Sequence, residues 1–236
     1  KTLKSGVPET IELIKPKNSI MVACTNIKSF NCEGNKITHL NLDYCALLQE
    51  LNCSNNEISA LDLKAAKNLQ ALDCSNNALA EINVSDNLAL LELNCSNNKI
   101  ATLDLKTAKD LQVLNCSNNA LAEINVNDNK MLIEFDCSNN EIDNLLLKNL
   151  KKLRKLNVSF NHLKECKASD IFIKEINISH NMIEDISLLN LLALERLDCS
   201  FNKIQGQLID GSSFKNLVYL DCSNNLITSL SVDNIT

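Results

Sequence analysis

A short apolar phrase returns along this chain at a nearly constant interval, and that interval restricts the fold more than any other feature. The phrase reads LQELNC at Leu48 and LQALDC at Leu69. Equivalent phrases open 21 residues apart at Leu48, Leu69, Leu90, Leu111, Leu132 and Leu153. The series continues at Ile173, Leu194 and Leu217 after spacings of 20, 21 and 23 residues, and it extends back to Ile27. A fixed period of about 20–29 residues predicts a solenoid of stacked units, here ten units over residues 27–236.

Alternate units are more alike than neighbouring ones. The unit from Leu48 contains ALDLKAAKN and the unit from Leu90 contains TLDLKTAKD, whereas the units from Leu69 and Leu111 share ALAEIN. A pair of units, 42 residues long, is therefore the unit of duplication.

The phrase LQELNCSNNEI predicts which side chains face the core. In a short strand, alternate residues point to opposite sides, so Leu48, Leu51, Cys53 and Ile58 are expected inside. Outward places are the third, fifth, seventh and eighth of each unit, and these include Glu50, Asn52 and Ser54 in the second unit. Strands stacked about 4.8 Å apart would form a parallel sheet on one face of the coil.

Cysteine occupies the sixth place of most units and is expected to be structural. The inward cysteines are Cys32, Cys53, Cys74, Cys95, Cys116, Cys137, Cys199 and Cys222, and we call them the cysteine ladder. Val158 and Ile178 fill the same place in the other two units, so the place requires a compact apolar group rather than thiol chemistry.

The cysteines are predicted to be free thiols without a metal. Parallel Cβ vectors on neighbouring strands keep Cβ atoms about one strand spacing apart, which exceeds the roughly 3.8 Å of a disulfide. No CxxC pair or histidine stands at the spacing of a zinc site. Cys24 and Cys45 are the exception, because they lie 21 residues apart near the N-terminal end and are candidates for a pair.

An asparagine stands at the ninth place of every unit. Its amide is expected to bond the backbone of its own and neighbouring turns, and thereby to close the turn in a chain with only four glycines. These residues form the asparagine ladder: Asn35, Asn56, Asn77, Asn98, Asn119, Asn140, Asn161, Asn181, Asn202 and Asn225.

The units LxxLxCxxNxLxxLDL resemble the leucine-rich repeat family, with Cys usually replacing the third Leu. The resemblance covers almost the whole chain and is closest to short, nested 21-residue repeats of bacterial type. It implies an α/β-type repeat solenoid of horseshoe form, mostly β, with a parallel sheet on the concave face. Short extended or turn segments are expected on the convex face. Residues 1–26 are apolar but off the pattern, and we expect them to form an N-terminal cap.

The sequence offers no enzyme chemistry. It has three histidines and no GxSxG, HExxH, P-loop or dinucleotide motif, so neither catalytic residues nor a cofactor is expected. Asp198 and Asp221 occupy equivalent outward places, but that column is Asn or Asp in every unit and is interpreted as a solvated polar ladder. The net charge of −6 argues against nucleic-acid binding, and no apolar run reaches the ~18 residues of a membrane span.

The outward face changes in the C-terminal half. The third place becomes Lys155, Glu175, Arg196 and Tyr219, and the eighth becomes Phe160, His180 and Phe201. Aromatic and arginine residues on a concave face are typical of a binding hot spot. The candidate partner-binding residues are Lys155, Phe160, His180, Arg196, Phe201 and Tyr219. The alternative, that each ring simply covers its turn, stays open at this point.

Two functions are compatible with the sequence. The first is a protein-binding module that uses its concave face, similar to bacterial surface or adhesin-like repeat proteins; a carbohydrate ligand is less favoured. The second is the recognition or scaffold segment of a larger effector or enzyme, with its catalytic domain beyond Thr236. Eleven cysteines without a disulfide framework, and NxS/T sequons on the concave strands, argue against a eukaryotic secretory route. We expect a bacterial cell surface or secretion, with a cytosol, including a host cytosol, as the alternative.

Overall fold

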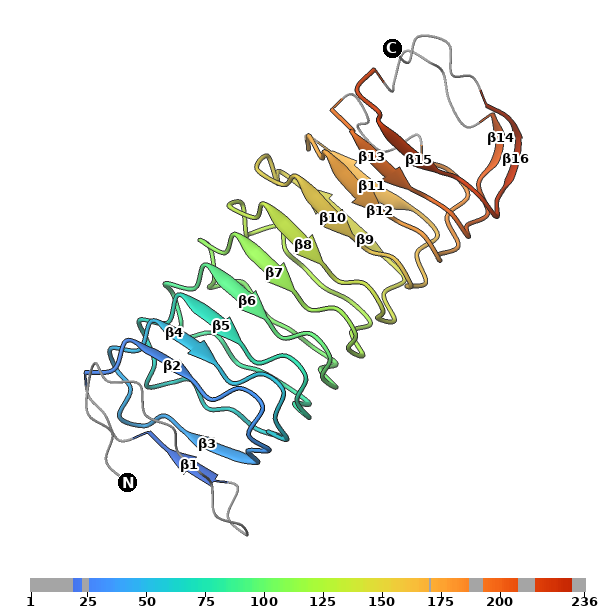
Figure 1. Ribbon diagram of the computed structural model, residues 1–236. Helices are drawn as coiled ribbons and strands as arrows, with labels where there is room; N and C mark the ends of the chain where they lie inside the picture. Colours follow the sequence, from blue (N-terminus) through green and yellow to red (C-terminus); the bar gives the residue numbers. More distant parts are fainter. Residues whose placement is uncertain (1–18, 23–25, 170, 187–192, 208–214, 231–236) are drawn as a thin grey trace.

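The computed structural model describes residues 19–22, 26–169, 171–186, 193–207 and 215–230. Its main feature is a ten-stranded parallel sheet with one strand from each repeat unit (Figure 1). The strands are β2 (Ser29–Asn31), β4 (Glu50–Asn52), β5 (Ala71–Asp73), β6 (Glu92–Asn94), β7 (Val113–Asn115), β8 (Glu134–Asp136), β10 (Lys155–Asn157), β12 (Glu175–Asn177), β13 (Arg196–Asp198) and β15 (Tyr219–Asp221). Equivalent places of successive units stand opposite one another throughout, as Glu50 does to Ala71.

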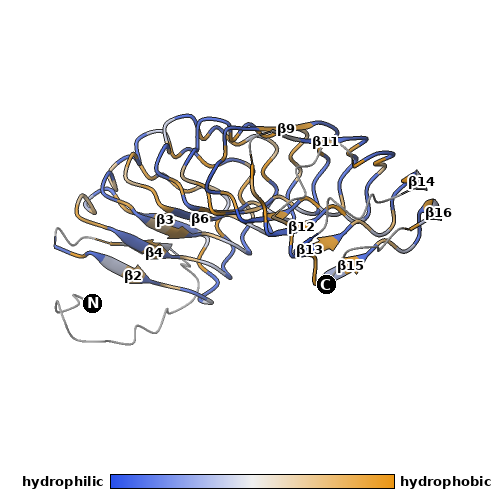
Figure 2. Ribbon diagram, turned by 90° about the horizontal axis from the view of Figure 1, so that it is seen from above, coloured by the Kyte–Doolittle hydropathy of each residue, from blue (hydrophilic) through white to orange (hydrophobic). Residues whose placement is uncertain are grey.

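In the part of the chain that the structure describes, the opposite face consists of turns and three short strand pairs. The pairs are β1 (Ser19–Met21) with β3 (His39–Asn41), β9 (Leu145–Lys148) with β11 (Cys166–Ser169), and β14 (Gln205–Gln207) with β16 (Leu226–Ser229). The coil curves so that the ten-stranded sheet lies on the inner side and β9 and β11 on the outer side (Figure 2). No helix occurs in the described part of the chain. The predicted repeat solenoid, with its concave sheet and extended or turn segments on the convex face, is therefore confirmed.

The predicted inward residues form one continuous core. Leu48, Cys53 and Ile58 are completely buried and Leu51 is nearly so, and the same places are buried in the next seven units. In the last unit, Leu220, Cys222 and Ile227 are only partly buried. The prediction for the seventh place was wrong, because Ser54 is buried rather than outward. The strand ends at Asn52, so the two-residue alternation ends there as well.

The Asn or Asp at the fifth place explains how each strand ends. Its side-chain Oδ1 accepts a hydrogen bond from the backbone N–H two residues later in all ten units. In most units the serine hydroxyl at the seventh place donates to the same oxygen, as Ser54 does to Asn52 at 2.7 Å. This arrangement is an Asx turn. The column is therefore more than the solvated ladder that we expected, and it accounts for the burial of the serines.

The asparagine ladder bonds neighbouring turns together as predicted. Asn140 Nδ2 donates to the carbonyls of Cys137 and Ser138 in its own turn and to that of Cys116 in the preceding turn, at 3.0–3.2 Å. Its Oδ1 accepts from the backbone N–H of Leu121 at 3.0 Å. The same set of bonds recurs at Asn56, Asn77, Asn98, Asn119, Asn161, Asn181, Asn202 and Asn225.

A different residue takes the place of glycine. The left-handed conformation falls on the exposed eighth place, with φ between 52° and 57° at Asn55, Asn76, Asn97, Asn118 and Asn139. Asparagine adopts this region at low cost because its short polar side chain bonds locally. The prediction that the ninth-place asparagine replaces glycine was therefore only half right. The eighth place turns the chain, and the ninth satisfies the backbone groups that the turn leaves open.

The cysteine ladder is buried, with one exception. Cys32 is buried with a small exposed fraction, and Cys53, Cys74, Cys95, Cys116, Cys137 and Cys199 are completely buried; all are free thiols in this structure. Cys222 is only half-buried, because no described strand pairs with the far side of β15. Cys24 lies outside the described residues, so its pairing with Cys45 stays a prediction.

The N-terminal cap is largely outside the described residues. Within the cap, β1 pairs with β3 and Val22 is buried, so residues 19–22 join the solenoid on the face opposite the ten-stranded sheet. The boundary of the cap, at residues 1–26, stays a prediction.

We predict that the buried thiols resist alkylation in the native protein. Burial raises the pKa of Cys95 to about 12 and the pKa of Cys116 well above its ordinary value, so almost no thiolate exists at pH 8. Mass spectrometry after brief iodoacetamide treatment should show Cys222 labelled, and Cys74 and Cys116 labelled only after denaturation. Rapid native labelling of Cys74 or Cys116 would contradict the buried assignment.

We also predict that Asn140→Ala destabilises the fold by about 3 kcal/mol or more. The change leaves the buried Leu121 N–H without a partner, which costs about 1–3 kcal/mol. It also removes one of the two hydrogen bonds to each carbonyl of Cys116, Cys137 and Ser138, at about 0.5–1.5 kcal/mol per bond. Asn139→Gly is the matched control, because glycine tolerates the positive φ there and should change stability by less than about 1 kcal/mol. Urea unfolding checks both, and equal losses would contradict the separate roles of the two asparagines.

Candidate functional site

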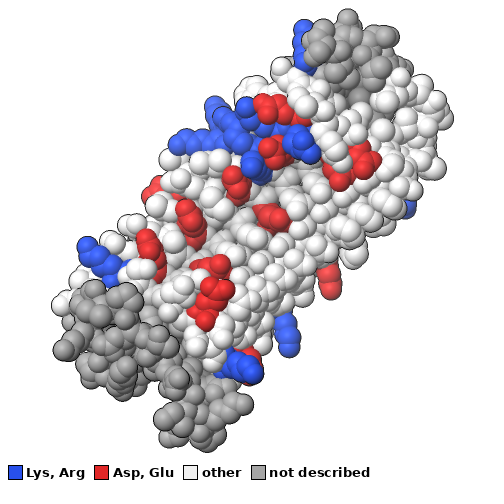
Figure 3. Space-filling view, viewed as in Figure 1, with Lys and Arg blue, Asp and Glu red and all other residues white. Residues whose placement is uncertain are grey.

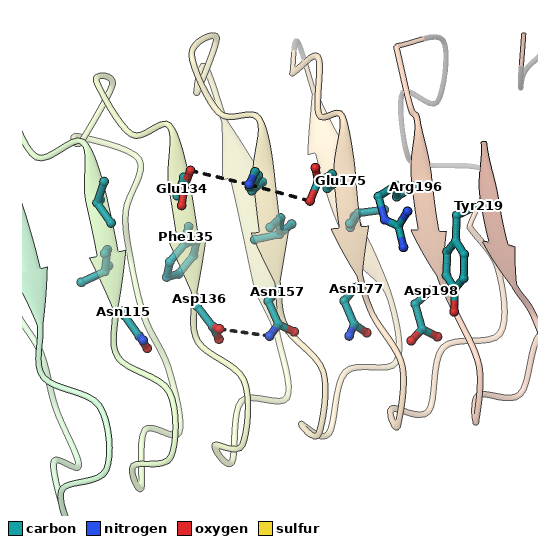
Figure 4. A pocket seen from close by; sticks show the side chains of 15 residues that line it. Asn115, Glu134, Phe135, Asp136, Asn157, Glu175, Asn177, Arg196, Asp198 and Tyr219 are labelled. Carbon is teal, nitrogen blue, oxygen red and sulfur yellow. Dashed lines mark hydrogen bonds and ion pairs between the residues drawn. The ribbon is translucent and has the colours of Figure 1, made fainter. Parts of the chain in front are cut away.

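A shallow groove of about 520 Å³ runs along the concave sheet in its C-terminal half. Its walls are third- and fifth-place side chains of β7, β8, β10, β12, β13 and β15, including Lys155, Arg196 and Tyr219 (Figure 4). A second groove of about 550 Å³ covers the N-terminal half of the same sheet, where Glu50 and Glu92 are the third-place residues. The two grooves are similar in size, so their side chains distinguish them.

Third-place side chains form one column along the C-terminal groove. The register places Lys155 between Glu134 and Glu175, and then Arg196 and Tyr219 on the following strands. Lys155 Nζ lies 3.9 Å from a carboxylate oxygen of each glutamate. All three side chains are about half exposed, so each pair stabilises the fold by less than about 1 kcal/mol. Such a lysine can exchange these partners for a ligand carboxylate at little cost.

Arg196 and Tyr219 form the aromatic end of this column. The guanidinium carbon of Arg196 lies 4.4 Å from the centre of the Tyr219 ring, a cation–π contact between β13 and β15. Tyr219 is 40% exposed, and Figure 4 shows both side chains pointing away from the core above the sheet. The contact holds the guanidinium in place while leaving hydrogen-bond donors available.

Amides and carboxylates of the fifth place line the lower part of the groove. Asn157 Nδ2 donates to Asp136 Oδ2 at 3.0 Å, and Asn177 and Asp198 continue the row (Figure 4). Hydrogen bonds from Ser223 lower the pKa of Asp221, the next residue in the row. The Asx turns therefore account for Asp198 and Asp221 as structural residues.

The three ring residues of the eighth place form a separate cluster, which we call the aromatic stack. Phe160 and His180 have ring centroids 4.0 Å apart at 11°, and His180 and Phe201 are 4.2 Å apart at 10°. These rings do not line the groove and lie at the edge of the sheet, just after the strands end. The six predicted residues therefore form two groups: Lys155, Arg196 and Tyr219 in the groove, and the aromatic stack beside it.

The aromatic stack occupies a strained backbone position. Phe160, His180 and Phe201 have φ of 51–53°, in the place where the earlier units have asparagine. A bulky residue in this region costs about 1–2 kcal/mol, and each stacked ring pair returns about 0.5–1.5 kcal/mol. Both phenylalanines remain nearly half exposed, at 48% and 47%. If the rings only covered the turn, their stacking would be explained. The presence of aromatic residues at a place where asparagine is less strained would not be explained.

Sequence reasoning did not assign Glu134 and Glu175 to the site as partners of Lys155. The signal was present, because both stand at the third place of units adjacent to that of Lys155. Their direction toward the lysine depends on side-chain conformation, which the repeat does not fix.

The described residues contain neither a candidate metal site nor a candidate membrane span. No group of three or more His, Cys, Asp or Glu side chains there could hold a metal ion. Within the same residues, no helix combines the length and hydrophobicity needed to cross a membrane.

We predict that Phe201→Asn changes the free energy of unfolding by less than about 1 kcal/mol. The asparagine relieves left-handed strain while one ring contact with His180 is lost, and the two effects are similar in size. Phe201→Val is the control, because it loses the same ring contact without relieving the strain, at a cost of about 0.5–1.5 kcal/mol or more, since a β-branched residue tolerates this region poorly. Urea denaturation compares them, and equal losses would show that backbone strain is unimportant here.

The comparisons with known proteins agree with this architecture. The family described as "Leucine Rich repeats (2 copies)" matches residues 193–234. No curated protein sequence matches the chain. A functional domain of InlJ from Listeria monocytogenes, which includes a cysteine ladder, is similar with 31% identity and a TM-score of 0.76. That match covers 90% of this chain and 52% of the InlJ chain.

Two further solved structures are similar. The leucine-rich repeat protein LIC12759 of Leptospira interrogans has 22% identity and a TM-score of 0.79, with 89% of this chain and 59% of that chain covered. YopM, a leucine-rich effector protein from Yersinia pestis, has 25% identity and a TM-score of 0.75, with 87% and 57% covered. The chain thus spans little more than half the length of these proteins. Its fold and relatives support a protein-interaction repeat module, and the chain belongs to the leucine-rich repeat family.

Proposed function

We propose that this chain is a non-enzymatic protein-binding module that engages its partner through the C-terminal half of the concave face. The observation that carries the proposal is the grouping of an Arg196–Tyr219 contact, a weakly paired Lys155 and half-exposed rings beside one groove. Arginine and tyrosine dominate binding energy in protein interfaces, and their conformational cost is small when the structure already holds them.

The aromatic stack extends this surface to the edge of the sheet. Rings in a strained conformation, half exposed to water, do not improve the fold over asparagine. Strained residues of this kind concentrate at functional sites. We therefore assign Phe160, His180 and Phe201 to the flank of the interface, with Arg196 and Tyr219 at its centre and Lys155 at the rim.

A protein fits the surface formed by the groove and the aromatic stack better than a carbohydrate does. The rings of the stack lie against one another, so the faces of His180 are covered on both sides by phenylalanine. Sugars stack on open ring faces, whereas edges and apolar rims suit peptide side chains. The partner-facing groups also mix cationic, anionic and aromatic character, which is typical of protein interfaces.

A second candidate is the recognition or scaffold segment of a larger effector or enzyme. It is favoured by the similarity to YopM, which is itself described as an effector protein. For localisation we propose a bacterial cell surface or secretion, since the similar structures include bacterial proteins such as InlJ. The cytoplasm, including that of a host cell, is the alternative that the effector function would require.

We predict that changing Arg196, Phe201 and Tyr219 to Ala together weakens partner binding by at least about 30-fold, because truncation at such a centre costs about 2 kcal/mol or more. Affinity capture with the wild type, followed by calorimetric titration of the identified partner, measures the change. The melting temperature should fall by only a few degrees, because the variant loses the ring contact of Phe201 with His180, worth about 0.5–1.5 kcal/mol, and exposed side chains otherwise contribute little to stability.

The matched control changes Glu50 and Glu92 to Ala in the N-terminal groove. This double variant should bind the partner with nearly unchanged affinity. Unchanged affinity of the triple variant with an intact melting curve would refute the proposed site, and loss in the glutamate variant alone would move the site to the N-terminal half.

A further inference from the structure

Three segments that lie 42 residues apart can be compared directly within this chain. Residues 67–71 read KNLQA, residues 109–113 read KDLQV and residues 151–155 read KKLRK. Each segment leads into a strand of the concave sheet, namely β5, β7 and β10. The lysine at the first position and the leucine at the third are shared. In the third copy, the remaining positions have become cationic: Lys152, Arg154 and Lys155.

The fold does not require these cations. The backbone N–H of Gln70, Gln112 and Arg154 donates to the preceding turn at 2.7–2.8 Å in all three copies. The leucine is completely buried in each copy, so the same turn forms with neutral or acidic neighbours. Placing four cations within five residues instead adds mutual repulsion. The change is therefore best explained by what this edge of the sheet binds.

We call Lys151, Lys152, Arg154 and Lys155 the basic edge. Lys151 and Lys152 are exposed and make no ion pair with any described residue. Arg154 Nη1 donates to the backbone carbonyls of Lys151, Leu153 and Phe172, so carbonyl groups position this charge and no described carboxylate pairs with it. Figure 3 shows Lys and Arg gathered at this edge of a chain whose net charge is −6.

The dimensions of the basic edge fit a peptide. Residues 151 and 152 lie in a turn that leads into β10, so the five residues span less than the roughly 13 Å of a fully extended segment. An extended peptide presents side chains on one side about every 6.8 Å, so two carboxylates match that length. A long polyanion such as RNA would also meet Glu134, Glu175 and Glu195 beside the edge, and their repulsion disfavours it.

We propose that the basic edge binds an acidic segment of a protein, with Lys151, Lys152 and Arg154 as its contacts to carboxylates. The inference rests on the proposed function in that a protein partner supplies the segment. The contact lies outside the groove and the aromatic stack, and the segment of the partner that it binds is negatively charged. Lys155, at the rim of the groove, connects the two surfaces.

The test uses a fluorescently labelled peptide of eight alternating Glu and Ser residues, with Gln replacing Glu in a control peptide. Anisotropy titration of the whole chain should show that the Glu peptide binds and the Gln peptide does not. Binding should weaken as salt is raised from 50 to 300 mM, because exposed charges are screened. The double variant Lys151→Gln/Lys152→Gln should reduce affinity for the Glu peptide at least about fivefold.

The chain supplies a matched control in Lys67→Gln/Lys109→Gln. These lysines hold the position of Lys151 in the two other copies, and the double variant removes the same charge from the same edge of the sheet. Its affinity for the Glu peptide should equal that of the wild type. If both double variants lose the same affinity for the Glu peptide, the effect is one of net charge and the inference is overturned. The inference is also overturned if the wild type binds the Glu and Gln peptides equally well.

Other anions are tested in the same titration. Tighter binding of a ten-nucleotide single-stranded RNA, or of vesicles containing an anionic phospholipid, would overturn the assignment to an acidic peptide. The variant with Arg196, Phe201 and Tyr219 changed to Ala retains the basic edge and should still bind the Glu peptide. If this variant does not bind the peptide, the peptide binds in the groove instead. If that variant keeps the protein partner, the proposed function fails while the peptide result stands.

Discussion

The solenoid depends on the hydrogen bonds of one side chain per turn, the ninth-place asparagine. Its amide donates to carbonyls of two successive turns and accepts from a backbone N–H of the preceding turn, so it satisfies groups that no strand ladder reaches. The strands are only three residues long over most of the sheet. Strand pairing alone would therefore leave much of the buried backbone without partners. The ladder allows a turn of about 21 residues to close with very few glycines.

A scaffold held from the inside leaves its outer positions free to change. The third place carries Glu50, Ala71 and Lys155 on strands with the same register. The eighth place must only accept a left-handed backbone, which asparagine does at low cost and phenylalanine at a higher one. Function can therefore be introduced without altering the core. Where the chain has phenylalanine at that place, contacts within the fold do not explain the added strain. The strain therefore indicates function.

Electrostatics separates the two halves of the concave face more clearly than shape does. Both grooves are shallow and of similar volume, but the N-terminal groove is lined by carboxylates without a cation, whereas the C-terminal groove sets Lys155 and Arg196 among its carboxylates. The cations of the basic edge add to this difference at residues 151–155. Because these charges are exposed, they guide the orientation and rate of association more than they contribute to affinity. An extended partner with its own charge gradient would be held in one direction along the coil.

The sequence by itself determined the number of stacked strands, the inward residues of most units, the burial of the cysteine ladder as far as Cys199 and the bonds of the asparagine ladder between turns. These follow from a strict period, because the same contacts repeat in every turn. Tertiary structure decided the burial of Ser54, the left-handed role of the eighth place, and the separation of Phe160, His180 and Phe201 from the groove. It also decided that Lys155 contacts both Glu134 and Glu175. The physical reason is that two-residue alternation ends with the strand, and beyond it hydrogen bonds and ring contacts between turns set each direction.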